Sequence, residues 1–285
     1  MTGERFLSGR ARLAGVMGWP VGHSLSPRLH GFWLRHYAID GAYLPLAVAA
    51  ENLAQALRAL PALGFRGCNL TIPHKEAALG LVDEATPTAL RIGAVNTVTI
   101  GEDGRLHGDN TDGLGFVASL REGWPAWQAA AGPAVLLGAG GAARAIATAL
   151  LNAGAPELRL LNRTRPRAEE LAAALGERAR VLDWGDWTAA LAGAALLANT
   201  TSLGMPGQPP LEVALDALPA EALVTDIVYA PLETALLLAA RARGNPAVDG
   251  LGMLLHQARP GFRAWFGVDP EVTPALRAAV LAGAG

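Results

Sequence analysis

A glycine-rich turn near the middle of the chain limits what this sequence can fold into more than any other feature. The segment Gly138–Ala143 directly follows the apolar run Ala134–Leu137 and opens a helical pattern. In such a setting Gly138 permits a tight turn, Gly140 lets a pyrophosphate approach the backbone, and the small Ala143 allows close helix–strand packing. The first N–H groups of the helix then face the phosphates. The pattern therefore predicts a dinucleotide-binding domain, where a Gly-rich turn alone would predict only a turn.

The end of the next apolar run indicates which dinucleotide is bound. An NAD site usually has an Asp or Glu about 20 residues after the glycine turn, where it holds the ribose 2′-hydroxyl. Here Asn162-Arg163-Thr164 stands at that point, Arg165 and Arg167 follow, and the first acid is Glu169. Guanidinium groups suit a 2′-phosphate, the alternative being a solvated arginine cluster. The sequence favours NADP(H) as the cofactor.

Short apolar runs alternate with helical patterns in both halves of the chain. Strands are predicted at 12–17, 42–48, 67–72, 134–137, 158–161, near Val181, near Leu196 and at 223–228. Helices are predicted at 27–37, 51–60, 142–152, 167–175, 232–243 and 251–266. A further helix is expected to begin at Pro73, because a proline at the first helical position loses no hydrogen bond. The alternation and the length of 285 residues predict an α/β protein of two domains, joined by 113–132, with mostly parallel sheets.

Lys75 is the only lysine among 23 basic residues, and the other 22 are arginines. Arginine can replace lysine in most structural tasks, but it does not release a proton near neutral pH. A lysine ammonium can pass a proton to a substrate oxygen. Arginine-biased composition would explain a single lysine equally well, so the surroundings of Lys75 decide the interpretation.

Pairs of uncharged polar residues surround the lysine in the sequence. Ser24 and Ser26 stand two residues apart before a helical pattern, and an extended segment would turn both hydroxyls to one side. Taken alone, Ser26 is better explained as a helix N-cap followed by Pro27. Asn69 and Thr71 repeat the spacing on the strand that leads to Lys75. Two such pairs predict a pocket for a polyhydroxylated small molecule.

Two further segments, Gly93–Thr97 and Gly108–Gly113, combine glycine with Asn, Asp and Thr. A calcium loop does not fit the second segment, because aligning Gly113 with the loop glycine places Gly108 and Ser119 at ligand positions. A plain turn remains an alternative. Together with Lys75, the segment offers a carboxylate, Asp112, that can hold a lysine ammonium and exchange protons with it.

Several classes of function are not supported by the sequence. The net charge of −2 and the sequence pI near 6.3 give no basic field for nucleic acid. The histidines lack a shared metal-ligand spacing, Cys68 has no partner cysteine, and no serine lies in a nucleophile elbow. We expect no metal and no membrane contact, since the apolar stretch 129–151 is interrupted by Arg144. The lone cysteine and the absence of a signal peptide in the first 25 residues predict a cytoplasmic location.

In order and along almost the whole chain, these segments resemble the shikimate dehydrogenase family. The matching stretches are Gly22–Pro27, Asn69–Lys75, Gly93–Thr97, Asn110–Asp112, Gly138–Arg144, Asn162–Thr164, Asn199–Met205, Asp226–Tyr229 and Gly250–Gln257. The resemblance implies reversible NADPH-dependent reduction of 3-dehydroshikimate to shikimate, in aromatic amino-acid and chorismate biosynthesis. It implies a substrate domain of residues 1–111 plus 250–285, to which the C-terminal helices return. It also implies a Rossmann-type NADP domain of residues 112–249.

The family roles, carried over to matching positions, give Lys75 and Asp112 as the catalytic pair. The substrate site would be lined by Ser24, Ser26, Asn69, Thr71, Lys75, Asn96, Asp112, Tyr229 and Gln257. The cofactor pyrophosphate would be bound by Gly138, Ala139, Gly140, Gly141, Ala142 and Ala143. The adenosine 2′-phosphate would be bound by Asn162, Arg163, Thr164 and Arg167, and the nicotinamide end would lie near Thr200, Met205, Gly250 and Met253.

One departure and three alternatives remain. The family often has Asn after the histidine of the serine motif, whereas this chain has His30-Gly31, which affects how the first helix docks. A quinate/shikimate or aminoshikimate dehydrogenase would share the fold, although the Ser24/Ser26 pair favours shikimate. A non-catalytic NADP-binding sensor would need the glycine turn and the arginines, but not Lys75 with Asp112. The sequence is compatible with a monomer or a homodimer.

Overall fold

The computed structural model describes residues 7–283 and divides into two compact units. The first unit contains the residues up to Thr111 together with those from Gln257 onward, and the second contains Asp112–His256. The chain therefore returns to the first unit inside the helix α9 (Leu251–Phe266), whereas the sequence places this return at residue 250.

A six-stranded mixed sheet forms the centre of the first unit, with the strand order β2-β1-β3-β5-β6-β4. Its strands are β1 (Arg12–Gly18), β2 (Gly41–Ala47), β3 (Phe65–Leu70), β4 (Glu84–Ala85), β5 (Thr97–Ile100) and β6 (Leu106–Asp109). Three pairings are parallel and two, β3 with β5 and β5 with β6, are antiparallel. The sequence predicted β1, β2 and β3 within about two residues but not the β5–β6 hairpin.

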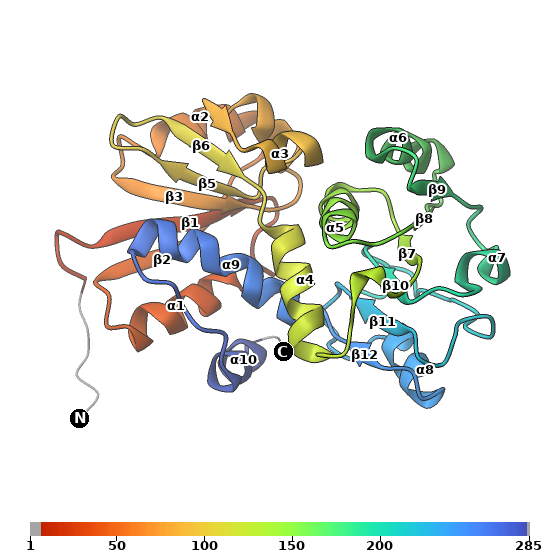
Figure 1. Cartoon of the computed structure of the whole chain (residues 1–285). Helices are drawn as coiled ribbons and strands as arrows, with labels where there is room; N and C mark the ends of the chain where they lie inside the picture. Colours follow the sequence, from red (N-terminus) through yellow and green to blue (C-terminus); the bar gives the residue numbers. More distant parts are fainter. Residues whose placement is uncertain (1–6, 284–285) are drawn as a thin grey trace. The chain divides into compact units, whose positions relative to one another are not determined.

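Helices cover both faces of this sheet (Figure 1). Their bounds are α1 (Ser26–His36), η1 (Ala50–Asn52), α2 (Leu53–Ala59), η2 (Ala77–Gly80), α3 (Pro87–Ile92), α9 and α10 (Pro274–Leu281). On one face, Leu53 and Leu57 of α2 and Ala89 of α3 pack with Cys68 of β3. On the other face, Trp33 of α1 contacts Phe262 of α9. The part of α9 from Gln257 onward therefore belongs to the core of the first unit.

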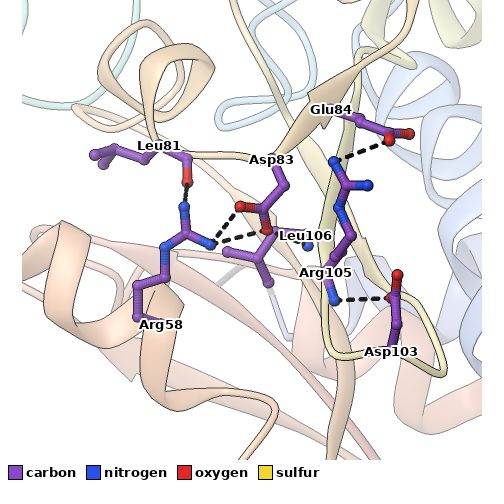
Figure 2. A network of polar contacts seen from close by, with 7 residues as sticks. All are labelled: Arg58, Leu81, Asp83, Glu84, Asp103, Arg105 and Leu106. Atoms are coloured by element: carbon purple, nitrogen blue, oxygen red, sulfur yellow. Dashed lines mark hydrogen bonds and ion pairs between the residues drawn. The ribbon is translucent and has the colours of Figure 1, made fainter.

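A polar network on the surface of the first unit ties the short strand β4 to its neighbours (Figure 2). The Arg58 guanidinium forms two 2.8 Å hydrogen bonds to the Asp83 carboxylate and one of 2.9 Å to the Leu81 carbonyl. The Leu106 N–H also donates to Asp83, at 2.8 Å. This backbone N–H and the Arg58 guanidinium lower the pKa of Asp83. The network fixes the residues just before β4, Leu81 to Asp83, against Arg58 of α2 and Leu106 of β6.

The second unit contains a six-stranded parallel sheet in the order β12-β11-β10-β7-β8-β9. Its strands are β7 (Ala134–Leu137), β8 (Leu158–Leu161), β9 (Ala179–Val181), β10 (Leu196–Asn199), β11 (Leu223–Asp226) and β12 (Ala247–Val248). Counted from β7, this is the 3-2-1-4-5-6 order of dinucleotide-binding folds. The order reverses between β7 and β10, where such folds bind their ligand.

Helices cover both faces of this sheet as well. Their bounds are α4 (Asp112–Gly123), η3 (Ala129–Ala131), α5 (Gly141–Asn152), α6 (Arg165–Leu175), α7 (Trp187–Leu191) and α8 (Ala235–Ala242). Side chains of α4, α5 and α6 pack in one buried cluster with β7 and β8, and those of α7 and α8 pack in another. At Gly113 of α4, a Cβ atom would lie 2.6 Å from the Ala145 carbonyl oxygen, so glycine allows α4 and α5 to pack closely.

Two of the predicted elements differ from the structure. The segment 113–132, treated as a connection, contains the helix α4. The helix predicted to begin at Pro73 is wrong, because only the short 3₁₀ helix η2 forms, at Ala77–Gly80. Tertiary hydrogen bonds use the groups that a helix would need: the Lys75 carbonyl accepts from Val95 N–H at 2.8 Å.

Candidate active site

Most of the predicted substrate residues lie in the first unit, around the carboxyl ends of β1 and β3. Asn69 stands near the end of β3, Thr71 and Lys75 follow it, and Asn96 directly precedes β5. Ser24 and Lys75 are half-buried, and four others are buried: Ser26, Asn69, Asn96 and Gln257. The predicted residues Asp112 and Tyr229 belong to the second unit.

Buried hydrogen bonds join three of these residues. The Asn69 side-chain amide donates to the Asn96 carbonyl oxygen at 3.1 Å. The Asn96 amide in turn lies 3.4 Å from Gln257 Oε1. Two residues that the sequence did not single out by role, Thr97 and Thr111, bridge the same amides. Both lie within the segments Gly93–Thr97 and Gly108–Gly113, which supplied the only signal for them.

Tyr43 also belongs to this group, although nothing in the sequence marks it. Its hydroxyl donates a 2.6 Å hydrogen bond to Asn69 Oδ1. Burial raises the pKa of Tyr43 well above its usual value, so the phenol remains protonated. Tyr43 therefore connects β2 to an asparagine of β3.

The geometry predicted for the two serines is wrong. Ser26 is the first residue of α1, and the residue before it, Leu25, has helical angles of φ −83° and ψ −5°. Ser24 and Ser26 thus do not share one extended segment. Neither is Ser26 the N-cap, since the cap position is Leu25. Instead the Ser24 hydroxyl accepts a 3.3 Å hydrogen bond from Ser26 N–H, at the open start of the helix.

The glycine turn of the second unit has the features that a pyrophosphate requires. Gly138 has φ +117°, and a Cβ atom there would lie 2.7 Å from Thr200 Oγ1. Gly140 and Gly141 have nothing within 4 Å of a built Cβ atom, so the backbone is open to a ligand. Gly140 is the N-cap of α5 and forms no side-chain cap hydrogen bond. The N–H groups at the start of α5 therefore suit phosphate oxygens.

The arginines between β8 and α6 differ in whether they form ion pairs. Arg165 is bound to Glu169 at 2.8 Å and to Asp183, and these acids raise the pKa of its guanidinium. Arg163 and Arg167 are exposed and form no ion pair with any residue from 7 to 283. Asn162 holds the turn through a 2.8 Å bond from its amide to the Thr164 carbonyl. Two uncommitted guanidinium groups fit a 2′-phosphate.

The remaining predicted cofactor positions lie at the ends of β10 and β11. Thr200 donates a 2.7 Å bond to the Leu137 carbonyl and so holds β10 against the glycine turn. Gly250 is buried against Ile227, whose carbonyl oxygen would lie 2.4 Å from a Cβ atom. Met205 and Met253 are half-buried. Tyr229 follows β11, and burial raises the pKa of its hydroxyl.

Residues 7–283 contain no group of three or more His, Cys, Asp or Glu side chains placed to hold a metal ion. Over the same residues, every helix is too short or too polar to cross a membrane.

The strand order and the open glycine turn define a class, the α/β proteins with a Rossmann-type dinucleotide-binding unit. Residues 16–98 match the family description "Shikimate dehydrogenase substrate binding domain". Residues 127–205 match "Shikimate / quinate 5-dehydrogenase", and residues 250–281 match "Shikimate 5'-dehydrogenase C-terminal domain". The chain belongs to the shikimate dehydrogenase family.

Relatives and solved structures agree with this membership. The NADP⁺ shikimate dehydrogenase of Rhodospirillum rubrum is 63% identical, over 96% of this chain and 99% of its own. The shikimate 5-dehydrogenase of Thermus thermophilus, solved with NADP(H) and shikimate, is 40% identical with a TM-score of 0.85, covering 95% and 99% of the two chains. The quinate dehydrogenase of Corynebacterium glutamicum, solved with NAD, is 34% identical with a TM-score of 0.88, covering 95% and 99%.

Proposed function

We propose that this protein is an NADP-dependent oxidoreductase that reversibly reduces 3-dehydroshikimate to shikimate. The observation that carries the proposal is the 63% identity, along nearly the whole of both chains, to an NADP⁺ shikimate dehydrogenase. The buried polar network of the first unit and the uncommitted Arg163 and Arg167 of the second unit support the same substrate and cofactor.

The proposed site residues are those carried over from the family resemblance. Ser24, Ser26, Asn69, Thr71, Asn96 and Gln257 bind the substrate in the first unit, with Tyr229 from the second. NADP(H), when bound, supplies or accepts the hydride. The N–H groups around Gly140 hold its pyrophosphate, and Arg163 and Arg167 hold its 2′-phosphate.

In the proposed mechanism Lys75 supplies the proton that the ketone oxygen needs when the neighbouring carbon is reduced. In the reverse direction the lysine takes that proton back. Asp112 is the second catalytic residue, which orients the substrate hydroxyl and exchanges protons with the lysine. The side chains of the first unit orient the substrate, and fixing reactants in this way lowers a barrier by several kcal/mol.

Quinate is the alternative substrate, because a quinate dehydrogenase solved with NAD has the same fold. Quinate users of this family tend to alter the second serine position, and Ser26 is retained here. A cytoplasmic location is supported by the single, buried Cys68, which forms no disulfide. We propose small molecules rather than nucleic acid or membranes as ligands, and a monomer or homodimer.

The test is the rate at which the reduced nicotinamide forms with shikimate and NADP⁺, measured beside quinate and beside NAD⁺. Turnover with shikimate and NADP⁺ at least about tenfold above the other pairs supports the proposal, since a matched 2′-phosphate contact is worth one to a few kcal/mol. Turnover with quinate or NAD⁺ instead would assign the alternative. NADP⁺ binding without turnover of either substrate would favour the sensor hypothesis.

A further inference from the structure

A chain of buried hydrogen bonds runs through the substrate residues of the first unit. Tyr43 Oη donates to Asn69 Oδ1 at 2.6 Å, and Asn69 Nδ2 donates to Thr97 Oγ1 at 3.1 Å. Thr97 Oγ1 then donates to Asn96 Oδ1 at 2.9 Å. Asn96 Nδ2 donates to Thr111 Oγ1 at 3.1 Å, and this hydroxyl donates to the Gln257 carbonyl at 2.8 Å.

Backbone groups fix the direction of this chain. Asn69 Nδ2 lies 3.1 Å from the Asn96 carbonyl oxygen, which can only accept, so that side-chain atom must be the nitrogen. Thr111 N–H, which can only donate, lies 2.9 Å from Asn96 Oδ1. At the far end of the chain of bonds, the Gln257 carbonyl oxygen can only accept, so the Thr111 hydroxyl is the donor. Turning over the Asn69 amide would set its oxygen against the Asn96 carbonyl oxygen, which also accepts from Leu70 N–H at 2.8 Å. Turning over the Asn96 amide would take its acceptor oxygen away from the buried Thr111 N–H, at a cost of about 1–3 kcal/mol.

The fixed direction determines what Asn69 can offer to a ligand. Both of its N–H groups are used, one by the Asn96 carbonyl and one by Thr97, and one lone pair of Oδ1 accepts from Tyr43. The second Oδ1 lone pair is the capacity that remains. Asn69 can therefore accept a hydrogen bond from a ligand but cannot donate one.

We propose that Tyr43 and Thr97 are positioning residues that hold Asn69 as a hydrogen-bond acceptor for a hydroxyl of the substrate. This inference rests on the proposed function, since it concerns the polyhydroxylated substrate assigned there. Tyr43 fixes Oδ1 from one side, and Thr97 fixes the amide nitrogen from the other. A substrate hydroxyl must then donate its proton to Asn69, which discriminates against ligands that have a keto or ether oxygen there.

His30 of α1 holds the Tyr43 ring in place. The two rings are stacked with centroids 3.9 Å apart and an angle of 5° between their planes. His30 is fully buried, and within the described part of the chain its two ring nitrogens have no hydrogen-bond partner. Burial lowers the pKa of His30 to about 3, so the imidazole is neutral. It acts as a flat, uncharged surface against which the phenol is fixed.

The first experiment compares Tyr43→Phe with Tyr37→Phe. The second variant is the matched control, because the Tyr37 hydroxyl belongs to the same unit but accepts from the Glu271 N–H instead. We expect Tyr43→Phe to raise the KM for shikimate roughly tenfold, the scale of a lost hydrogen bond. The KM for NADP⁺ should stay within about twofold of the parent value, and Tyr37→Phe should change neither constant. A shikimate KM within about twofold of the parent in Tyr43→Phe overturns the proposal.

The second experiment breaks the chain at its middle with Thr97→Val, using Thr99→Val as the control on the same strand. The Thr99 hydroxyl forms one long hydrogen bond within residues 7–283, of 3.5 Å to the His107 carbonyl. Thr97→Val should raise the shikimate KM as Tyr43→Phe does. Because both residues act through Asn69, the double variant should be no worse than about twice the larger single effect. Multiplied effects would show two independent roles and overturn the proposal.

Two controls distinguish a lost fold or an inactive parent from the absence of a positioning role. Circular dichroism and thermal unfolding identify a variant that has lost its fold, and only variants with the parental fold enter the kinetic comparison. If Tyr43→Phe fails this check, the Thr97→Val series decides alone. A parent protein without activity on shikimate would overturn the proposed function, and with it this assignment. If the parent is active and a correctly folded Tyr43→Phe variant keeps the parental KM for shikimate, the positioning role alone is overturned.

Discussion

Lys75 is held by its backbone rather than by a regular helix. Its carbonyl accepts from Val95 N–H at 2.8 Å, and the preceding His74 imidazole is hydrogen-bonded to the Val48 carbonyl at 2.8 Å. These contacts fix the segment on both sides of the lysine, while the side chain itself is half-buried. A proton donor needs a backbone that is held in place and a side chain that is not completely buried.

If Lys75 is the proton donor, Lys75→Ala should lower kcat by about 10²-fold or more, the usual scale of general acid–base catalysis. Lys75→Arg should fail in a similar way, because the charge is kept but the transferable proton is lost. Steady-state rates with shikimate and NADP⁺ measure both effects. A kcat close to the parent value in either variant would contradict the assignment.

Asp226 gives a separate prediction about stability and pH. It is buried at 1% exposure and accepts from Asn199 at 2.9 Å, Val228 N–H at 3.0 Å and Thr234 at 2.9 Å. Burial nevertheless raises its pKa from 3.8 to about 6. The folded state therefore keeps a proton that the unfolded chain has already lost between these values. The free energy of unfolding should fall by up to about 3 kcal/mol as the pH rises from about 4 to about 7.

Asp226→Asn should remove this loss, because the amide keeps one acceptor oxygen and cannot ionise. Urea unfolding of parent and variant at several pH values between about 4 and 7 provides the measurement. The stability difference should shift in favour of the variant as the pH rises. Asp216→Asn, at an almost fully exposed side chain of the same unit, is the control and should follow the parent curve. Parallel curves for parent and Asp226→Asn would refute the prediction.

At the scale of elements, the turn between β7 and α5 contains one glycine that folding requires, Gly138, and one that cofactor binding requires, Gly140. Gly138→Ala should destabilise the protein by about 1–3 kcal/mol, because φ is +117° and Thr200 occupies the space. Gly140 has φ −85°, and its built Cβ atom contacts nothing. Gly140→Ala should leave the melting temperature unchanged and raise the KM for NADP⁺ by about tenfold or more, because a methyl group would keep the pyrophosphate from the backbone. Equal effects of both variants on stability would contradict this division.

The connection from β8 to α6 offers a matched pair of arginines. Arg163→Ala should weaken NADP⁺ binding by about tenfold or more and leave NAD⁺ binding unchanged, since only NADP⁺ carries the 2′-phosphate. Arg165→Ala, two residues away, should leave both affinities near the parent values, because that guanidinium is bound to Glu169 and Asp183. Calorimetric titration with the two cofactors distinguishes the outcomes. An equal loss of NAD⁺ binding in Arg163→Ala would exclude a phosphate-specific role.

Elements with a strong local signal were predicted best. The bounds of β7, β8 and α9 agree with the sequence, because apolar runs, interrupted in β8 only by Arg159, and a long helical period set them. The β5–β6 hairpin was missed because its two strands mix apolar residues with Thr, His, Gly and Asp, and therefore give no apolar run. The helix expected after Pro73 fails because tertiary hydrogen bonds override a local preference.

The same division applies to the candidate site. Lys75, Asn69 and the glycine turn are visible in the sequence because rare residue types or a recognised motif mark them. Tyr43 could not be found in this way, since one tyrosine on an apolar strand has no distinguishing neighbours in the chain. Its hydrogen bond to Asn69 depends on the β1–β2 and β1–β3 pairings, which bring together two residues that are 26 positions apart in the chain.

At the scale of the whole molecule, the C-terminal segment completes the first unit. Trp33 Nε1 donates to the Glu271 carbonyl at 2.9 Å, and Trp265 Nε1 donates to the Val98 carbonyl at 3.0 Å. Leu276 and Val280 of α10 are fully buried. The first unit is thus built from two stretches of chain distant in sequence, and it cannot be complete until the second stretch has been synthesised.

A chain that ends at Phe266 should therefore lose stability in the first unit and keep it in the second. The truncation exposes the apolar surface that Leu276 and Val280 cover, and it leaves the Trp33 indole N–H without its acceptor. Together these losses cost several kcal/mol of folding free energy. Hydrogen exchange read by mass spectrometry should show faster exchange in β1–β3 and α1, with β7, β8 and β10 protected as in the parent.

Point variants of the full-length chain test the same dependence if the truncated protein aggregates. Leu276→Ala should cost about 2–5 kcal/mol and affect exchange in the first unit only. Leu238→Ala, at a side chain of α8 that is 54% exposed, is the control and should cost less than about 1 kcal/mol. Faster exchange spread equally over both sheets in Leu276→Ala would mean that the units unfold as one. In that case the return of the C-terminal helices would stabilise the whole protein rather than the first unit.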